Sequence, residues 1–374
     1  MVSMPTGYRA YVPIRLPPSP SVDLAALEPI SSEANLALGR LDGVADVVPD
    51  PELFVRMYVK KEAVLSSQIE GTQASLDDIF AAEVGEADDA GEEKRQDVRE
   101  VNNYVEALSA GLRRLESLPL SLRLLCEMHA ILMSGVRGKD KTPGEFRRSQ
   151  NWIGPPGASL ATAAFVPPPP DQVLDHMGDL EKFFRVPEKL PVLVRVGMAH
   201  AHFETIHPFL DGNGRLGRLL MTFMLCERGV LRRPLLYLSA YLTANKQEYY
   251  DRLMAVRFRG EWEAWLVFLL TGVRDVANAA VAKARAITEL REKHARLIRE
   301  KLPHRKKAMD LLDHLLRTPR VNVLVTEMLL DVTNPTANAL VADFESIGIL
   351  REVTGRMRDR VFRYDEYINI LNRD

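Results

Sequence analysis

One run of the chain, residues 207–218, concentrates side chains that can do phosphate chemistry. It reads His-Pro-Phe-Leu-Asp-Gly-Asn-Gly-Arg-Leu-Gly-Arg. His207, with an ordinary pKa of about 6.5, can take a proton from a hydroxyl at neutral pH. Asp211 could hold Mg²⁺ on a phosphate oxygen. The run therefore predicts a nucleotide-phosphate site with a general base beside it.

The glycine-rich part of this run predicts an anion-binding turn. The apolar stretch LLMTFMLCERG follows it and predicts a helix, so the turn lies at a helix N-terminus. Gly212 and Gly214 place no Cβ in front of the backbone N–H groups, which bind an anion together with the helix dipole. Arg215 and Arg218 are three residues apart on the first helical turn, so we expect both to face the same anion.

Taken singly, a His-Pro pair or a Gly-x-Gly usually marks an ordinary turn, but so many informative positions in one unbroken run make chance a poor explanation. The run resembles the Fic motif H-P-F-x-D-G-N-G-R-x-x-R at every specified position. The resemblance implies a mainly α-helical core that uses ATP and Mg²⁺ to move AMP onto a target protein. It implies that His207 is the catalytic base and Asp211 the metal ligand. The phosphate-binding residues would be Gly212, Asn213, Gly214, Arg215, Gly217 and Arg218.

A second short motif lies upstream, at the end of a helix predicted from Pro51 to Gly71. Glu70 falls in the last turn of this helix, where a carboxylate is unfavourable unless a cation meets it. Arg218 is the candidate cation. The stretch Ser66–Gly71 resembles the inhibitory motif [ST]-x-x-x-E-[GN] of Fic proteins. The resemblance implies that Glu70 pairs with Arg218 and blocks the seat of the ATP γ-phosphate.

The character of the chain changes after Gly138, where turn residues surround two β-prone pieces, Asn151–Ile153 and Ala164–Val166. A two-stranded hairpin with a stiff polyproline exit at 167–170 is the natural interpretation, although an ordinary surface loop fits the residues equally well. The segment resembles the Fic flap. That implies that Phe165 and Val166 lie beside the active site and that a target segment docks there as an added strand.

Several helices are expected to position this site. Residues 98–108 carry an apolar stripe, His129 is predicted to be a packing residue, and a helix ending near residue 206 leads into the catalytic run. His200 and His202 are two apart on that helix and point about 200° apart, so they do not share one metal ion. His200 is expected to steady the loop as a polar core residue. The resemblance also implies that Tyr250 lines an adenine pocket.

The domain organisation predicted from these patterns has four parts. Residues 1–97 form an N-terminal strap and the inhibitory helix, with 81–97 as an exposed loop, and 98–275 form the catalytic core. Residues 276–301 form a connecting helix, and 302–374 resemble a winged helix-turn-helix. The third helix of this last part, 334–348, has no Lys or Arg but contains Asp343 and Glu345. Despite a basic wing at 355–360, a protein-contact role is favoured over specific DNA binding.

The composition excludes little but gives no sign of a nucleic-acid or membrane surface. The formal net charge is −2, and the apolar runs are interrupted too often for an expected membrane span or signal core. Cys126 and Cys226 lie in apolar helical patterns and are predicted to be buried thiols. We therefore expect a cytoplasmic protein without nucleic-acid or membrane partners. A homodimer is left open.

The resulting interpretation is a protein adenylyltransferase. It would move AMP from ATP to a Ser, Thr or Tyr hydroxyl of a target, and of itself, under restraint by Glu70. Two alternatives remain open at this stage. One is a transcriptional regulator whose Fic core senses a nucleotide, and the other is a Fic member that removes AMP or transfers another phosphate-bearing group. The full G-N-G-R sequence favours AMP transfer, because the related kinases carry a lysine in the glycine turn.

Overall fold

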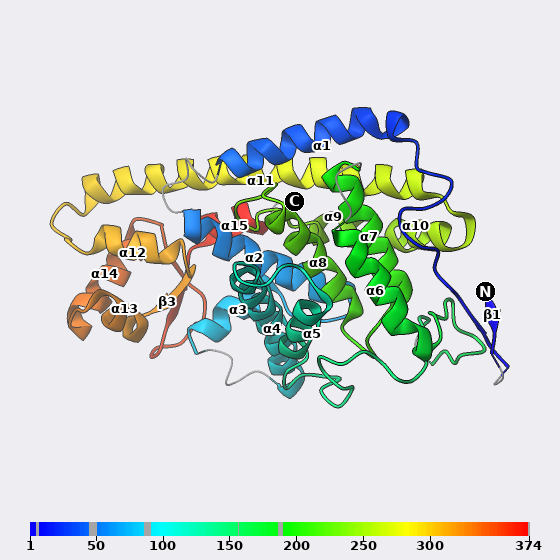
Figure 1. Cartoon of the computed structure of the whole chain (residues 1–374). Coiled ribbons are helices and arrows are strands. Elements are labelled where there is room, and N and C mark those ends of the chain that lie inside the picture. Colours follow the sequence, from blue (N-terminus) through cyan, green and yellow to red (C-terminus); the bar gives the residue numbers. More distant parts are fainter. Residues whose placement is uncertain (5–6, 45–50, 86–90, 156, 186–189, 373–374) are drawn as a thin grey trace.

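A computed structural model describes residues 1–4, 7–44, 51–85, 91–155, 157–185 and 190–372. The chain is mainly α-helical, as predicted, with two small sheets (Figure 1). The helices of the first half are α1 (Leu24–Val44), α2 (Pro51–Ile69), α3 (Leu76–Glu83), α4 (Glu92–Leu115), α5 (Leu122–Leu132), α6 (Val173–Phe184) and α7 (Val192–Ile206). Those that follow are α8 (Asn213–Glu227), α9 (Ser239–Ala244), α10 (Lys246–Arg259) and α11 (Trp262–Lys301).

The longest helix, α11, runs along one side of the molecule with α1 beside it (Figure 1). The two helices run in the same direction. Near their starts the side chain of Glu263 accepts a hydrogen bond from the backbone N–H of Asp23, and further along both helices Arg274 pairs with Glu33. By length and composition α11 could cross a membrane, contrary to the expectation from the sequence, but 56% of its apolar window is buried inside the protein. A core helix has the same character. The predicted boundary at 275/276 falls within this single helix.

The segment 81–97, predicted to be an exposed loop, is helical at both described ends. Residues 81–83 complete α3, and α4 begins at Glu92. Asp97 is buried and pairs with Arg137, and the neighbouring Glu100 pairs with the same guanidinium at 2.7 Å. The prediction failed here because charged residues are usually solvated, whereas these two carboxylates face a cation from a distant loop. Residues 86–90 lie outside the described part.

The C-terminal part contains the predicted helices and two elements that the sequence analysis missed. It comprises α12 (Ala308–Leu315), β3 (Arg320–Asn322), α13 (Val323–Leu330), α14 (Asn334–Ser346), β4 (Arg351–Glu352), β5 (Val361–Arg363) and α15 (Asp365–Asn372). The missed elements are β3 and α15. The sheet has the order β3-β5-β4, with antiparallel neighbours. This arrangement is compatible with a winged helix-turn-helix, which remains a prediction.

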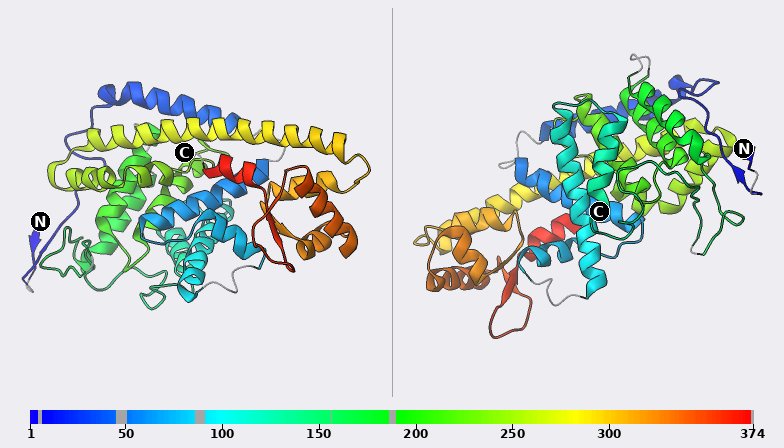
Figure 2. Two further views of the ribbon diagram at one scale, coloured as in Figure 1. Left: turned by 180° about the vertical axis from the view of Figure 1, so that it is seen from behind. Right: turned by 60° about the horizontal axis from the view of Figure 1, so that its bottom comes forward.

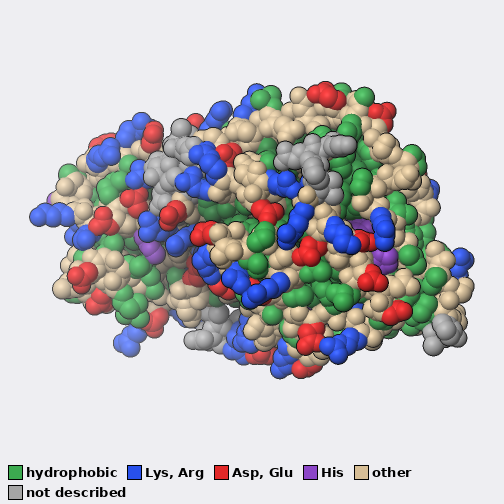
Figure 3. Space-filling view, in the orientation of Figure 1, with side chains coloured by type: hydrophobic (Ala, Val, Ile, Leu, Met, Phe, Trp, Pro, Cys, Tyr) green, Lys and Arg blue, Asp and Glu red, His purple; other side chains and the backbone are tan. Residues whose placement is uncertain are grey.

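The C-terminal part packs against the N-terminal helices, with α15 returning to α2 and α11 (Figure 2). Lys61 on α2 donates to the carbonyl of Leu371 on α15 at 2.8 Å. The carboxylate oxygen Oδ2 of Asp77 on α3 forms ion pairs with guanidinium nitrogens of Arg320 on β3 at 2.6 Å and of Arg363 on β5 at 3.4 Å. Acidic and basic side chains are interspersed over the face shown in Figure 3, in keeping with the small net charge.

Both cysteines are free thiols, and they are only partly buried rather than fully buried as predicted. Burial nevertheless raises the pKa of Cys126 to about 11 and that of Cys226 to about 12. Both side chains are therefore thiols at neutral pH.

Candidate active site

Residues 207–212 of this run connect α7 to α8, and the backbone of the connection is left-handed at both ends. His207 has φ 50° and ψ 60° after the last residue of α7, and Gly212 has φ 73° before the first residue of α8. The side chain of Asn213 accepts from the N–H of Phe209 at 2.9 Å and donates to its carbonyl at 2.8 Å. Asn213 was expected to bind phosphate. Its side chain instead closes the turn, which leaves only its backbone N–H for an anion.

Two residues that the sequence analysis missed hold the backbone of this turn from outside. Arg147 is buried and donates to the carbonyl of His207 at 2.9 Å and to that of Pro168 at 2.6 Å. Asn151 donates to the carbonyls of His207 and Phe209 at 3.1 and 2.8 Å. Burial lowers the pKa of Arg147 to about 10, so it stays charged at neutral pH. Bonds to main-chain carbonyls carry no sequence signature, so these contacts could not be predicted.

Asp211 is held in place by two further residues. His129 accepts from the N–H of Gly144 through Nδ1 at 2.8 Å, so its Nε2–H donates to the carbonyl of Asp211 at 2.9 Å. Burial lowers the pKa of His129 to about 4, which keeps the ring neutral. The ring also stacks on Phe209, so the predicted packing role is accompanied by a positioning one. Lys141, another missed residue, forms an ion pair with the Asp211 carboxylate at 2.8 Å.

The N-terminus of α8 presents an anion-binding end, and the carboxylate of Glu70 lies against it. The first N–H groups of a helix have no partner within the helix, so those of Asn213, Gly214 and Arg215 point out of the end of α8. A Cβ built on Gly214 would lie 2.0 Å from Oε1 of Glu70. Glycine at this position therefore lets a carboxylate approach the helix end closely.

Glu70 pairs with Arg218, as predicted from the end of α2. The guanidinium donates to Oε1 of Glu70 at 2.8 Å, to the hydroxyl of Ser66 at 2.7 Å and to the carbonyl of Ser66 at 2.9 Å. The Arg218 side chain is 1% exposed and that of Glu70 is 39% exposed. Burial opposes ionisation of Glu70, but the charge and hydrogen bond of Arg218 outweigh it and lower the pKa of this carboxyl. Ser66, the first residue of the upstream motif, thus has a direct role in the contact.

Arg215 forms its ion pair with a different carboxylate from Arg218, although its charge also lowers the pKa of Glu70; that both arginines face one phosphate stays a prediction. The Arg215 guanidinium is buried and lies 3.5 Å from Oε2 of Glu100 on α4. Glu100 also accepts from the hydroxyl of Thr72 at 3.0 Å. The two arginines therefore tie α8 to two different elements, Arg215 to α4 and Arg218 to the end of α2.

Gly217 faces α7 rather than the anion-binding end of α8. A Cβ at this position would lie 2.5 Å from Oε1 of Glu204 and 3.2 Å from the ring of Phe203. Gly217 was expected to bind phosphate. The structure shows instead that it makes room for close packing of α7 on α8, because residue 217 is on the inner side of the first turns.

His207 is uncharged at neutral pH. Burial lowers its pKa to about 4, and the nearby cation of Arg257 acts in the same direction. Arg257 is itself buried and donates to the carbonyl of Glu204 at 2.9 Å. Burial raises the pKa of Glu204 to about 7. A neutral imidazole next to arginines is suited to accept a proton, as a general base must.

The two histidines of α7 have different surroundings, since His202 is buried near His176 and Asp179. His200 is buried between Gly217, whose carbonyl receives its Nδ1–H at 3.0 Å, and Tyr249, whose hydroxyl donates to its Nε2 at 2.8 Å. His200 is therefore a buried polar core residue that ties α7 to α8 and α10, and a role in steadying the loop stays a prediction. Tyr250, expected in an adenine pocket, is 38% exposed and its ring centroid lies 5.2 Å from that of Tyr249.

The flap has less strand structure than the two-stranded hairpin that was predicted. Ile153 and Phe165 form one antiparallel bridge, with hydrogen bonds of 2.8 and 3.0 Å. The prolines on both sides lack the N–H groups that would extend the ladder. Phe165 and Val166 are buried, and the carbonyl of Val166 accepts from the backbone N–H of Tyr11 in the N-terminal strap.

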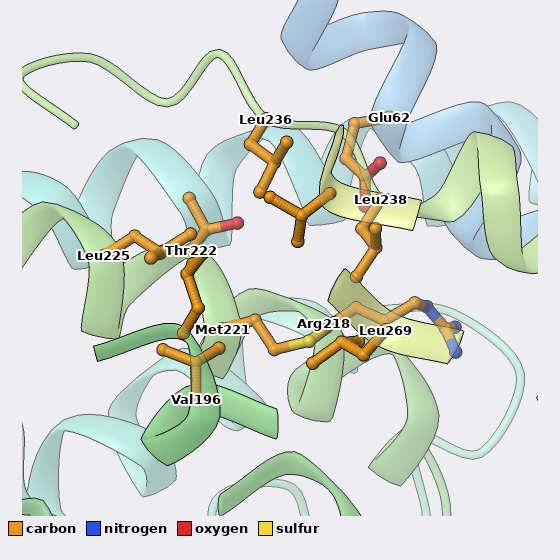
Figure 4. Close-up of a pocket in the computed structure, with 11 residues that line it drawn as sticks. Glu62, Val196, Arg218, Met221, Thr222, Leu225, Leu236, Leu238 and Leu269 are labelled. Carbon is orange, nitrogen blue, oxygen red and sulfur yellow. The ribbon is translucent and has the colours of Figure 1, made fainter. Parts of the chain in front are cut away.

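A buried carboxylate, Glu62, anchors α2, the helix that precedes Glu70. It accepts from the hydroxyl of Tyr104 on α4 at 3.1 Å and from the backbone of Ser239 on α9 at 3.2 Å. Burial raises its pKa. Figure 4 shows that Glu62 and Arg218 border the same small, largely apolar pocket. The buried region next to α2 therefore includes both Glu62 and Arg218, the ion-pair partner of Glu70.

The chain belongs to the Fic/DOC family. Residues 30–113 match the N-terminal domain of that family and residues 119–225 match the family domain itself, which together make up about half of the chain. The catalytic run lies within the second match. The first match contains α2 with Ser66 and Glu70, so both sides of the ion pair fall within regions typical of the family.

Among curated relatives, the chain is 27% identical over 205 residues to a probable protein adenylyltransferase of Aquifex aeolicus, covering 52% of this chain and 57% of that protein. It is 31% identical over 117 residues to the protein adenylyltransferase Fic of Drosophila grimshawi, covering 31% of this chain and 22% of that protein. The chain thus spans little more than half of the first relative and about a fifth of the second.

Solved structures support the fold over nearly the whole chain. A Fic family protein from Desulfovibrio desulfuricans has a TM-score of 0.58 at 19% identity, with 96% of this chain and 98% of that chain covered. A Fic domain containing signaling protein from Bacteroides thetaiotaomicron has a TM-score of 0.51 at 17% identity, with 67% and 97% covered. At these identities the likeness shows the arrangement of helices alone.

Proposed function

We propose that this protein is an adenylyltransferase that moves AMP from ATP onto a hydroxyl of a target protein, and that Glu70 restrains it. The observation that carries the proposal is the position of the Glu70 carboxylate. It lies on Arg218 and against Gly214, at the end of a helix built to bind an anion. An anion of the protein itself therefore sits where a phosphate of the nucleotide would bind. The curated relatives named protein adenylyltransferase support the same activity.

The chemistry follows from the protonation states in the site. Nδ1 of His207 is buried, which leaves Nε2 available to a bound hydroxyl. Nε2 takes the hydroxyl proton while the oxygen attacks the α-phosphorus of ATP. The new O–P bond forms as the bond from that phosphorus to the pyrophosphate oxygen breaks. The N–H groups at the start of α8 stabilise the negative charge on the phosphates, and a Ser, Thr or Tyr side chain can supply the hydroxyl.

The residues around Asp211 fit Mg²⁺ bound together with ATP. Mg²⁺ usually keeps several waters and binds one or two carboxylates plus substrate phosphates. Asp211 supplies one carboxylate, whose pKa is lowered by Lys141 and the N–H of Gly212 despite partial burial. No cluster of three metal-binding side chains occurs among the described residues, so phosphate oxygens would complete the coordination. Bound there, the ion would neutralise phosphate charge.

Once Glu70 withdraws, Arg218 would hold the γ-phosphate in its place. A guanidinium that already makes three hydrogen bonds in a fixed geometry is well suited to a phosphate. The flap would position the target segment through main-chain hydrogen bonds, which read little of its sequence. Tyr250, exposed beside the site, would contact the adenine.

The part of ATP that becomes attached to protein distinguishes AMP transfer from the alternative functions. The Glu70→Gly variant is incubated with ATP labelled on either the α- or the γ-phosphate, and the same variant with His207→Ala is the control. We expect protein-bound label from the α-phosphate alone, and a loss of about 10²- to 10⁴-fold in the control. Label from the γ-phosphate would identify a kinase. Silence with both labels would leave nucleotide sensing as the better explanation.

A further inference from the structure

Two buried polar atoms beside the catalytic base have no side-chain hydrogen-bond partner among the described residues, and the backbone of Glu204 lies against the His207 ring. The two atoms are Nδ1 of His207 and Oε1 of Glu204. The other oxygen of Glu204, Oε2, lies 3.9 Å from Nδ1 of His207. Unpaired polar atoms are costly in a protein interior, and native structures contain few of them. Two such atoms on facing side chains therefore point to a contact that is made in another state of the site.

The fold places the Glu204 carboxylate between the catalytic loop and α8. Glu204 lies on the last turn of α7, three residues before His207, and it is buried. Gly217 on α8 leaves the space that its carboxylate occupies. The charged and titratable groups that surround the pair come from four other elements: Arg218 (α8), Arg257 and Tyr249 (α10), Glu70 (the end of α2) and Arg147 (the segment before the flap).

We propose that Glu204 is the carboxylate partner of His207, accepting a hydrogen bond from Nδ1–H when the ring takes the proton of the target hydroxyl. This inference rests on the proposed function and names a positioning residue for it. In the resting site His207 is neutral and carries its single proton on Nδ1. When Nε2 accepts the hydroxyl proton, the ring becomes an imidazolium. A shift of about 1 Å then brings Oε2 within hydrogen-bond distance of Nδ1.

Ionisation of Glu204 fits this role. Burial raises its pKa to about 7, and the nearby charge of Glu70 also raises it. A carboxyl with a raised pKa is ionised above that pKa and protonated below it. The ionised form stabilises the imidazolium, so activity is expected to rise with pH through the neutral range. Below that range the neutral acid offers no charge to balance Arg257 and Arg147, and of the carboxylates around His207 the more distant Glu70 stays ionised.

The first test is kinetic and uses Glu70→Gly as the active background. Adding Glu204→Gln keeps the side-chain volume but removes the charge. We expect kcat to fall about 10- to 100-fold while the KM for ATP changes less than about threefold. The rise of kcat through neutral pH should disappear, leaving a flat profile between about pH 6 and about pH 9. Glu227→Gln, at the far end of α8, is the matched control and should match the background.

The second test does not depend on activity. Histidine ring signals are followed by NMR in the otherwise unmodified protein and in Glu204→Gln, and His207→Ala assigns the signals of His207. We expect the His207 signals to shift with a midpoint near the pKa of Glu204, about 7, and this shift to be absent in Glu204→Gln. Signals of the other histidines should coincide in the two proteins, which checks folding.

The outcomes separate this proposal from the proposed function. If the Glu70→Gly background carries no label, the function fails, while the NMR titration still decides whether the pair exists. If Glu204→Gln lowers kcat but leaves both the pH profile and the His207 titration unchanged, Glu204 has a packing role and the proposal is overturned. Equal kcat in the two proteins overturns it as well.

Discussion

Gly214 lies at the point where, under the proposed function, the Glu70 carboxylate and an incoming phosphate need the same space. A Cβ there would lie 2.0 Å from Oε1 of Glu70 and 3.0 Å from the nearest guanidinium nitrogen of Arg218. The carboxylate is the end of a flexible side chain and can move away. The helix end cannot, so a methyl group at this position would remain in the path of the phosphate.

We predict that Gly214→Ala displaces Glu70 without activating the enzyme. Because the methyl group also blocks phosphate approach, label from α-labelled ATP should stay at the basal level in Gly214→Ala. In the Glu70→Gly background the same change should lower labelling by about 10²-fold or more. Gly178→Ala in α6 is the matched control, since a Cβ there meets no atom within 4 Å. Labelling by Gly214→Ala as strong as that by Glu70→Gly would show that this glycine serves Glu70 only.

Single residues were predicted from sequence where they carry their own chemical signature. Glu70 and Arg218 could be paired because a carboxylate at a helix C-terminus needs a cation. The phosphate contacts predicted for two residues do not match their side-chain directions, for a geometric reason. The side chain of Asn213 and the Cα of Gly217 both face inward, and the sequence does not show which side of the first helical turn is inside.

Among the elements, helices were predicted best because their caps and apolar stripes are local. The N- and C-terminal limits of α2 follow from Pro51 and Gly71. Elements that depend on distant partners were missed or overestimated. Strand β3 exists because β5 pairs with it, and the flap ladder stops after Ile153 and Phe165. The residue pattern of one segment does not show which distant segment pairs with it or where the pairing stops.

Helix α2, which precedes Glu70, is held along its length and at its end. Glu62 binds α4 and the start of α9, and Lys246 donates to the carbonyl of Ile69 at 2.7 Å. The carbonyls at the end of a helix have no partner within the helix, so this lysine also favours the observed end of α2. These contacts fix the position of Glu70 without involving the nucleotide site, so the contact of Glu70 with Arg218 can be lost while α2 stays in place.

At the scale of the whole molecule, Asp77 joins the C-terminal part to the segment from α2 to α3. Two arginines from different strands, Arg320 and Arg363, meet this one carboxylate, and their side chains are only 10% and 24% exposed. The segment from α2 to α3 is therefore attached to both the catalytic core and the C-terminal part. A change in the packing of the C-terminal part would therefore alter the contacts of α3 directly, through Asp77.

We predict that Asp77→Asn loosens this attachment. Loss of hydrogen bonds to a charged group costs about 1.5–3 kcal/mol, less where solvent screens the pair. Hydrogen–deuterium exchange should increase in α3 and in β3 and β5, with α7 and α8 unchanged. Asp310→Asn is the control, because its pair with Lys307 is an exposed local contact at the start of α12. Equal exchange in Asp77→Asn and the unmodified protein would contradict a joining role for Asp77.

The most direct test of the central claim, restraint of AMP transfer by Glu70, is the initial rate of self-labelling from α-labelled ATP. The rate is compared in the unmodified protein, in Glu70→Gly and in Glu70→Gly with His207→Ala. Removing the carboxylate from Arg218 should raise the rate by about tenfold or more, and the added His207→Ala should return it to background. Equal rates in the unmodified protein and Glu70→Gly would contradict the account, because the ion pair would then impose no restraint.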